Sequence, residues 1–163
     1  MSSTPFFLFY VLEYGLARWY SSDGLQFSCT QCSHCCRHEP GFVYLSQKDL
    51  TNLCLYFNLE EQEFIKQYCR WVPYYDGNEV LCLLEKENND CIFWDSGCAA
   101  YGARPVKCST YPFWSYIVKS LETWNQEATE CPGINRGQLH VGSEIEEAVR
   151  CYEENEPIKR QEG

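Results

Sequence analysis

Apolar residues recur at helical spacing in the stretch that follows Ser46. Positions 50, 53, 54 and 57 are all apolar, and intervals of three and four residues place them on one face of a helix. Ser46 and Asp49 stand three residues apart at the start of this stretch, which is the spacing of a capping box. The pattern therefore predicts a helix through about Phe57, with Cys54 on its buried face.

Two further helices are predicted from the same kind of pattern. One begins at residue 58 and ends near residue 68 or 70, with apolar residues at positions 64, 65 and 68 forming its buried stripe. The other, residues 143–155, opens with Ser143 and has Glu146 three residues later, again as in a capping box.

Short strands are predicted where aromatic and β-branched residues are bounded by turn residues. Residues 71–75 and 80–84 fit this pattern, and Asp76-Gly77-Asn78 lies between them as a turn. The sequence therefore predicts a hairpin here. Other short strands are predicted at residues 42–45, 113–118 and 121–124, and a short helix or strand packed on the core at residues 6–20.

The bulk composition favours one folded domain. The chain has 163 residues, of which 45% are hydrophobic and 16% aromatic, enough to bury a core. No internal repeat or low-complexity segment divides it. We expect residues 1–163 to form a single α+β domain that is small and loop-rich, with short strands and about three helices.

Acidic residues dominate the charge of the chain. The 23 aspartate and glutamate residues outnumber the 13 lysine and arginine residues, which gives a net charge of −10. Nucleic acid is not predicted as a partner, because binding its phosphates needs clustered basic residues. Arg37, Arg104 and Lys107 stand close to cysteines in the sequence, and there we expect them to offset the charge of metal-bound thiolates.

The first apolar run, residues 6–12, has no basic residue before it and is followed by Glu13. A secretory signal needs a basic region ahead of its apolar run, so none is predicted. No run reaches the length of a membrane span either. We therefore expect a cytoplasmic protein with no membrane partner. In a reducing cytosol, clustered cysteines bind metal more often than they form disulfides.

The twelve cysteines carry the strongest chemical signal, and four of them fall within eight residues: Cys29, Cys32, Cys35 and Cys36. A Cys-x2-Cys step curls the backbone so that two sulfurs reach one ion, and this run makes two such steps in succession. A disulfide between Cys35 and Cys36 would be strained, since neighbouring Cα atoms lie about 3.8 Å apart. We expect the vicinal pair to serve different ions or to bridge two.

Four later cysteines lie in turn-rich sequence, where a sulfur can point at a metal without disturbing a helix: Cys91, Cys98, Cys108 and Cys131. With the first four they make eight, enough for two tetrahedral sites or for a cluster with shared sulfurs. The remaining four are predicted to be buried, structural thiols in or near regular elements. These are Cys54, Cys69, Cys82 and Cys151.

The ordered set of motifs resembles the YkgJ family, the CxxCxxCC family of zinc- or iron-chelating proteins. The resemblance covers residues 27–133 and includes Arg104-Pro105 before Cys108 and Tyr111-Pro112-Phe113 after it. It implies that the eight cysteines named above are the metal ligands. Many members have an arginine directly after the cysteine that corresponds to Cys108, whereas this chain has Ser109.

Iron is the alternative to zinc as the bound metal. The family also resembles the cysteine-rich part of a bacterial flagellin lysine N-methylase, in which such cysteines are associated with an iron–sulfur cluster. The chain has no GxGxxG nucleotide fingerprint, and a bacterial ferredoxin run needs three residues between its third and fourth cysteines, where this chain has none. His34 and His38 are further donors near the first cysteines, although exposed loop positions suit them better.

We predict a metal-binding protein, stapled by thiolate-bound metal, rather than an enzyme. Zinc is the expected ion, because closed sites built only from cysteine suit it, and the expected arrangement is two cysteine-rich sites. Their role is metal chelation or a structural or interaction function. The alternative is an iron–sulfur protein or a component of a methyltransferase-like or redox enzyme.

Overall fold

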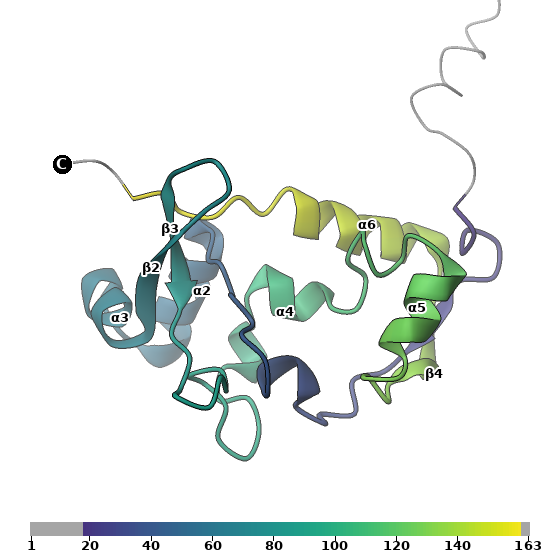
Figure 1. Cartoon of the computed structure of the whole chain (residues 1–163), viewed down its shortest axis with the longest axis horizontal. Coiled ribbons are helices and arrows are strands. Elements are labelled where there is room, and N and C mark those ends of the chain that lie inside the picture. The colour runs from purple at the N-terminus through teal and green to yellow at the C-terminus, as the bar shows by residue number, and fades with distance from the viewer. Residues whose placement is uncertain (1–17, 161–163) are drawn as a thin grey trace, which may run out of the picture.

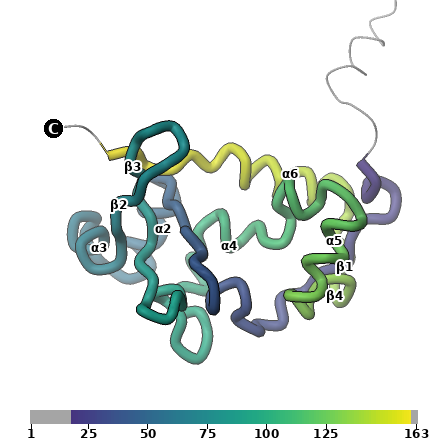
Figure 2. The backbone as a smooth tube through the Cα atoms, viewed as in Figure 1, coloured from purple at the N-terminus to yellow at the C-terminus, as the bar shows by residue number. Residues whose placement is uncertain are grey.

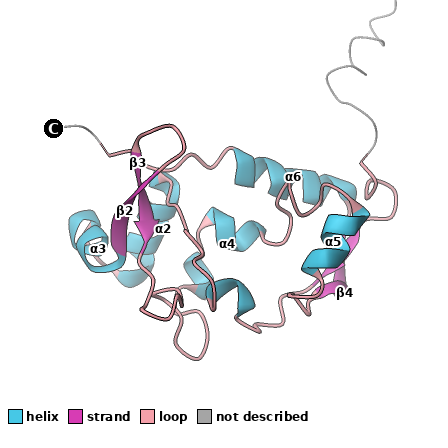
Figure 3. Ribbon diagram, viewed as in Figure 1, coloured by secondary structure: helices cyan, strands magenta, loops and turns pink. Residues whose placement is uncertain are grey.

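The computed structural model describes residues 18–160 and shows five α-helices among short antiparallel strands (Figure 1). Coloured by secondary structure, the chain has long loops between these elements (Figure 3). The helices are α2 (Gln47–Phe57), α3 (Glu61–Tyr68), α4 (Val106–Thr110), α5 (Leu121–Glu127) and α6 (Gly142–Glu153), with 3-10 turns η1 (His34–Cys36) and η2 (Tyr101–Ala103). The strands are β1 (Leu25–Phe27), β2 (Cys69–Pro73), β3 (Glu79–Leu83) and β4 (Ile134–His140). The mixed α+β class is as predicted, but residues 18–160 contain five α-helices where about three were expected.

The predicted helix after Ser46 is present as α2 and begins as expected. The Ser46 hydroxyl accepts a hydrogen bond from the Asp49 N–H at 3.2 Å, and the Asp49 carboxylate accepts one from the Ser46 N–H at 3.1 Å. Asn58 ends α2 in the left-handed region, with φ of 52°. The next helix therefore begins at Glu61, three residues later than predicted.

The two sheets each contain two antiparallel strands. The predicted hairpin is confirmed, with β2 paired to β3 from Cys69 opposite Leu83 to Pro73 opposite Glu79. The β character predicted at residues 42–45 is confirmed only as a one-residue bridge from Tyr44 to Cys82, beside which Leu45 donates to the Leu81 carbonyl at 3.0 Å. In the other sheet β1 pairs with β4, and a register shift follows Gln26.

The predicted strands at residues 113–118 and 121–124 are wrong. The first stretch consists mainly of turns, and the second lies in α5, which Ser120 caps by accepting from the Thr123 N–H at 3.1 Å. Aromatic content gave these stretches a strand-like composition, while the capping pair decides the conformation. Residues 134–140 were expected to form a polar loop, because they show no apolar alternation. They form strand β4, in which most residues are exposed.

Helix α6 begins one residue earlier than predicted, at Gly142. The Glu144 carboxylate accepts a hydrogen bond from the Val141 N–H at 3.1 Å, so Glu144 takes the capping role expected of Glu146. The element predicted at residues 6–20 lies mostly outside the described residues, and Trp19 and Tyr20 belong to a turn. Among residues 18–160, no helix has both the length and the apolar character to span a bilayer.

Two hydrophobic clusters lie at opposite ends of the molecule (Figure 1). One, the hairpin lobe, is formed by α2, α3, β2 and β3, around residues such as Leu50 and Phe64 that have no exposed surface. The other, the α6 lobe, is formed by β1, β4, α5 and α6, around Trp124 and Ile145. Helix α4 lies between the two lobes in the view of Figure 1.

Two connections hold the lobes together. After α6 the chain runs back to the hairpin lobe (Figure 2), where the Ile158 N–H donates to the Leu45 carbonyl at 2.9 Å. Asp49, only 3% exposed, accepts from the Val106 N–H of α4 and from the Asn155 side-chain amide, both at 2.9 Å. One buried carboxylate thus fixes α4 and the segment after α6 to the start of α2.

Candidate metal centre

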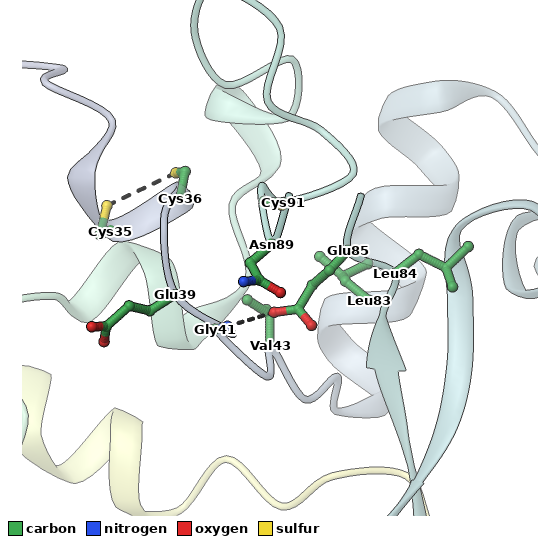
Figure 4. A pocket seen from close by; sticks show the side chains of 10 residues that line it. All are labelled: Cys35, Cys36, Glu39, Gly41, Val43, Leu83, Leu84, Glu85, Asn89 and Cys91. Atoms are coloured by element: carbon green, nitrogen blue, oxygen red, sulfur yellow. Dashed lines mark hydrogen bonds between the residues drawn. The ribbon is translucent and has the colours of Figure 1, made fainter. Parts of the chain in front are cut away.

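The two cysteine-bearing segments meet between the lobes. The first runs from β1 to η1, and the second is the loop that follows β3. The Cys91 N–H donates to the Cys36 carbonyl at 2.7 Å, which joins the segments directly. Figure 4 shows this junction, with Cys35 and Cys36 on η1 and Cys91 at the loop across from them. The two sets of cysteines predicted that these segments come together, but the sequence did not predict the backbone bond between Cys36 and Cys91.

The backbone of the first segment curls at each Cys-x2-Cys step. Gln31 and Ser33 lie in the left-handed region with φ of 56° and 66°, a conformation that reverses the chain locally. The Cys36 N–H then donates to the Ser33 carbonyl at 2.9 Å and closes the 3-10 turn. The predicted curling of the Cys-x2-Cys steps is therefore present.

A cavity of about 350 Å³ lies beside this junction, and six cysteines are among the residues that line it. Its other walls include Leu83, Phe93 and Tyr101, with Arg104 and Asp95 among the polar residues. The cysteines that line it are Cys29, Cys35, Cys36, Cys91, Cys98 and Cys108.

A smaller cavity of about 30 Å³ adjoins it, since Cys29 and Cys35 line both. Phe27, His34 and Tyr111 also line the smaller cavity. Its cysteines are Cys29, Cys32, Cys35 and Cys131. The structure thus brings all eight predicted ligands to two adjoining cavities.

The other four cysteines line neither of these two cavities. Cys69 and Cys82 are buried in the hairpin lobe, as predicted, and burial raises the pKa of these thiols to about 12 and about 11. Cys54 and Cys151 lie on α2 and α6 and are only partly buried. All twelve cysteines are free thiols. Cys54 packs against the core of the hairpin lobe, whereas Cys151 contacts the exposed Glu147 carboxylate, so the prediction that Cys151 is buried is wrong.

The cavity thiols influence one another electrostatically. A hydrogen bond from Cys36, with sulfurs 3.9 Å apart, lowers the pKa of Cys35 to about 7. Burial raises the pKa of Cys108, and the neighbouring Cys91, Cys35 and Cys98 raise it further. A metal ion that binds these sulfurs has to displace their protons, so its affinity should fall as the pH is lowered.

The chemical type of these donors suits zinc or iron, because thiolates are the ligands of structural zinc and of iron–sulfur clusters. Within residues 18–160, however, no three cysteine, histidine or acidic side chains converge closely enough to hold one metal ion. The sulfurs line the cavities without forming a closed coordination shell. Binding would require the loops around Cys32 and Cys98, both exposed or partly exposed, to move inwards.

Comparison with known proteins assigns the region that carries the eight cysteines to a protein family. Residues 28–132 match the CxxCxxCC family, whose description reads "Putative zinc- or iron-chelating domain". The chain belongs to the CxxCxxCC family. Membership supports metal binding, with zinc or iron as the ion.

A relative of this CxxCxxCC protein is the uncharacterized protein MJ0661 of Methanocaldococcus jannaschii, which is 28% identical over 94 residues. The match covers 56% of this chain and 47% of the relative, so the chain spans about half of that protein's length. No solved structure matches the chain.

The three basic residues near the cysteines of this CxxCxxCC protein differ in their partners, and within residues 18–160 only Arg37 pairs with a carboxylate. The Arg37 Nε lies 3.3 Å from both carboxylate oxygens of Asp90, and its guanidinium stacks 3.8 Å above the Trp94 ring. Lys107 donates to the Gly41 carbonyl. Arg104 is the one of the three that lines the larger cavity. Asp90 was read from the sequence only as part of a loop, because its partner is 53 residues away.

The aromatic and histidine residues near the cysteines have distinct places. Tyr111 lines the smaller cavity and donates to the Glu127 carboxylate at 2.7 Å, a support that the sequence did not indicate. His34 lines the same cavity and lies 3.2 Å from a Glu130 carboxylate oxygen. Trp94 packs under Arg37 and is absent from the walls of both cavities.

Replacing Arg37 with alanine should weaken metal binding by about 10- to 100-fold, the usual cost of losing a group that orients metal ligands. The substitution removes the contact that holds η1 to the loop beginning at Asp90. Competition with a chromophoric zinc chelator measures the affinity. Arg18→Ala is the matched control, because among residues 18–160 the Arg18 side chain pairs only with the exposed Glu146, at 3.9 Å. Equal affinities in the two variants would contradict the role given to Arg37.

Proposed function

We propose that this chain chelates two zinc ions through its eight cavity-lining cysteines. The observation that carries the proposal is the division of these thiols between the cavities. Four line the smaller cavity: Cys29, Cys32, Cys35 and Cys131. The other four line the larger of these two cavities and not the smaller: Cys36, Cys91, Cys98 and Cys108. Each set has the four thiolates that a tetrahedral zinc site requires.

This division gives the vicinal pair a simple role. Cys35 belongs to the set of the smaller cavity and Cys36 to that of the larger one, so each thiolate would serve its own ion. Adjacent residues cannot easily present both sulfurs to one tetrahedral ion, because neighbouring side chains diverge. The two sites would then share a backbone junction at η1, and the filling of one would position a ligand of the other.

Charge also bears on the proposal. A zinc ion with four thiolates carries a net charge of about −2, and two such sites would place a large negative charge between the lobes. The guanidinium of Arg104 lines the larger cavity, and the imidazole of His34 lines the smaller one. The larger site therefore has a permanent cation, Arg104, that can offset part of its charge.

Iron is the second candidate, and one observation favours it. Cys29 and Cys35 line both cavities, so their sulfurs are placed to bridge metal ions, as sulfurs do in clusters with shared ligands. An iron–sulfur cluster in the larger cavity would make the chain a redox protein or an enzyme component.

Anaerobic purification with metal analysis and an absorption spectrum tests the proposal. We expect a colourless protein with about two zinc ions per chain, as eight thiolates at four per ion would give. A brown protein containing iron and inorganic sulfide would contradict the zinc assignment and support the cluster.

The same zinc-loaded preparation separates chelation from a structural role. For chelation, zinc should pass to a competing chelator while the circular dichroism spectrum keeps its helical signal, because each lobe has a core of its own. Unfolding on removal of zinc would instead indicate that the metal is structural.

A further inference from the structure

The larger cavity has more room than a metal ion needs. Its volume of about 350 Å³ is far above the 30 Å³ of its neighbour, although the same number of thiolates would close each zinc site. A tetrahedral zinc site is filled by its own sulfurs. Cavities of about 300–1,000 Å³ are the size that accommodates small organic ligands in proteins. In the open arrangement described here, before any inward movement of its sulfurs, the larger cavity therefore falls in the range of a ligand pocket.

The wall that carries no thiols is mainly apolar. Leu83, Phe93 and Ala100 line it and are 2%, 5% and 1% exposed, so they form a fixed surface continuous with the core of the hairpin lobe. Tyr101 and Pro105 extend this wall. A ligand that fills the space would bury an apolar body here and gain about 25 cal/mol for each Å² removed from water.

Arg104 supplies a charged group at the same cavity. Its Nε donates to the Tyr101 carbonyl at 3.2 Å, and its guanidinium lies 3.9 Å from the centre of the Tyr101 ring. These contacts hold the side chain in place. Across residues 18–160 no carboxylate lies within ion-pair distance of it, in contrast to Arg37 and Arg70. Asp95 lines the cavity too but does not pair with it.

We propose that the larger cavity binds a small organic carboxylate, with the carboxylate on the Arg104 guanidinium and an apolar body against Leu83, Phe93 and Ala100. A guanidinium presents paired N–H donors that match the two oxygens of a carboxylate. A phosphate dianion fits less well, since one arginine would not balance two charges beside thiolates. The inference rests on the proposed function, because bound zinc would hold Cys98 and Cys108 as the opposite wall.

Calorimetric titration of the zinc-loaded full chain tests the inference. Benzoate and hexanoate are the probes, one with a flat and one with a flexible apolar body, and inorganic phosphate is the comparison. We expect one carboxylate to bind per chain and more tightly than phosphate. Arg104→Gln should weaken binding at least about tenfold, the loss of a charge-assisted contact, and Arg104→Lys should weaken it less. Arg160→Gln is the matched control, because Arg160 pairs with Glu79 in the hairpin lobe.

Metal analysis of the same samples keeps the outcomes apart. A wild-type chain that retains no metal would contradict the proposed function itself. Retained zinc with no carboxylate binding, with equal binding in Arg104→Gln, or with tighter binding of phosphate would overturn the inference alone. Loss of zinc from Arg104→Lys, which keeps the positive charge beside the thiolates, would also overturn it, because the guanidinium itself would then serve the metal ligands.

Discussion

Replacing Cys108 with serine should cost the chain one of its two zinc ions. Cys108 lies among Cys91, Cys35 and Cys98, whose charges all act on it, and it belongs to the set that lines the larger cavity and not the smaller. A serine hydroxyl is a poor zinc ligand beside thiolates. The zinc affinity of that site should fall by more than about 100-fold, beyond the usual cost of losing an orienting group. Metal analysis after dialysis against a weak chelator measures the loss.

Cys151→Ser provides the control for this prediction. Cys151 is partly buried on α6 and lines neither cavity, so this variant should keep both ions. Retention of two zinc ions by Cys108→Ser would contradict the assignment of Cys108 as a ligand. Loss of both ions, with the fold intact, would show that the two sites fill together.

Replacing Asp49 with alanine should lower the free energy of unfolding by about 3 kcal/mol, more than the loss of an ordinary helix cap. The carboxylate is 3% exposed and accepts hydrogen bonds from Ser46, Val106 and Asn155. Alanine leaves the Val106 N–H without this acceptor and frees α4 from α2. Urea unfolding of the zinc-loaded protein measures the change.

Ser120→Ala is the matched control for Asp49→Ala. It removes the cap of α5, which is a local hydrogen bond to Thr123, and should cost about 1 kcal/mol. Equal costs for the two variants would contradict the linking role of Asp49. Because α4 carries Cys108, we also expect Asp49→Ala, but not Ser120→Ala, to weaken zinc binding.

Local signals in the sequence predicted the parts of the fold that depend on neighbouring residues. The capping pair of Ser46 and Asp49 predicted the start of α2, and the turn at residues 76–78 predicted the β2–β3 hairpin. Strand β4 was missed because its pairing with β1 joins residues more than a hundred positions apart, such as Leu25 and His140. Its own residues carry little strand signal, since tertiary pairing decides their conformation.

For the candidate site too, local sequence signals predicted some features and long-range contacts decided the rest. Spacing and turn context selected the eight cysteines that line the cavities, and the same context set Cys69 and Cys82 apart. Which sulfurs line which cavity depends on the fold and could not be predicted from the sequence. The partners of Arg37 and Asp49 could not be predicted either, because Asp90 and Val106 lie more than fifty residues away from them in the sequence.

The return of residues 154–160 from α6 to the hairpin lobe has a consequence for how fast the chain could take up metal. Bonds such as that from the Ile158 N–H to the Leu45 carbonyl tie the lobes together through the backbone itself. The thiols of the two segments are therefore held close together, which gives each a high effective concentration near the others. Most of the entropy of closing the long loop from residue 36 to residue 91 is already lost on folding. An arriving ion would have only short local segments left to order.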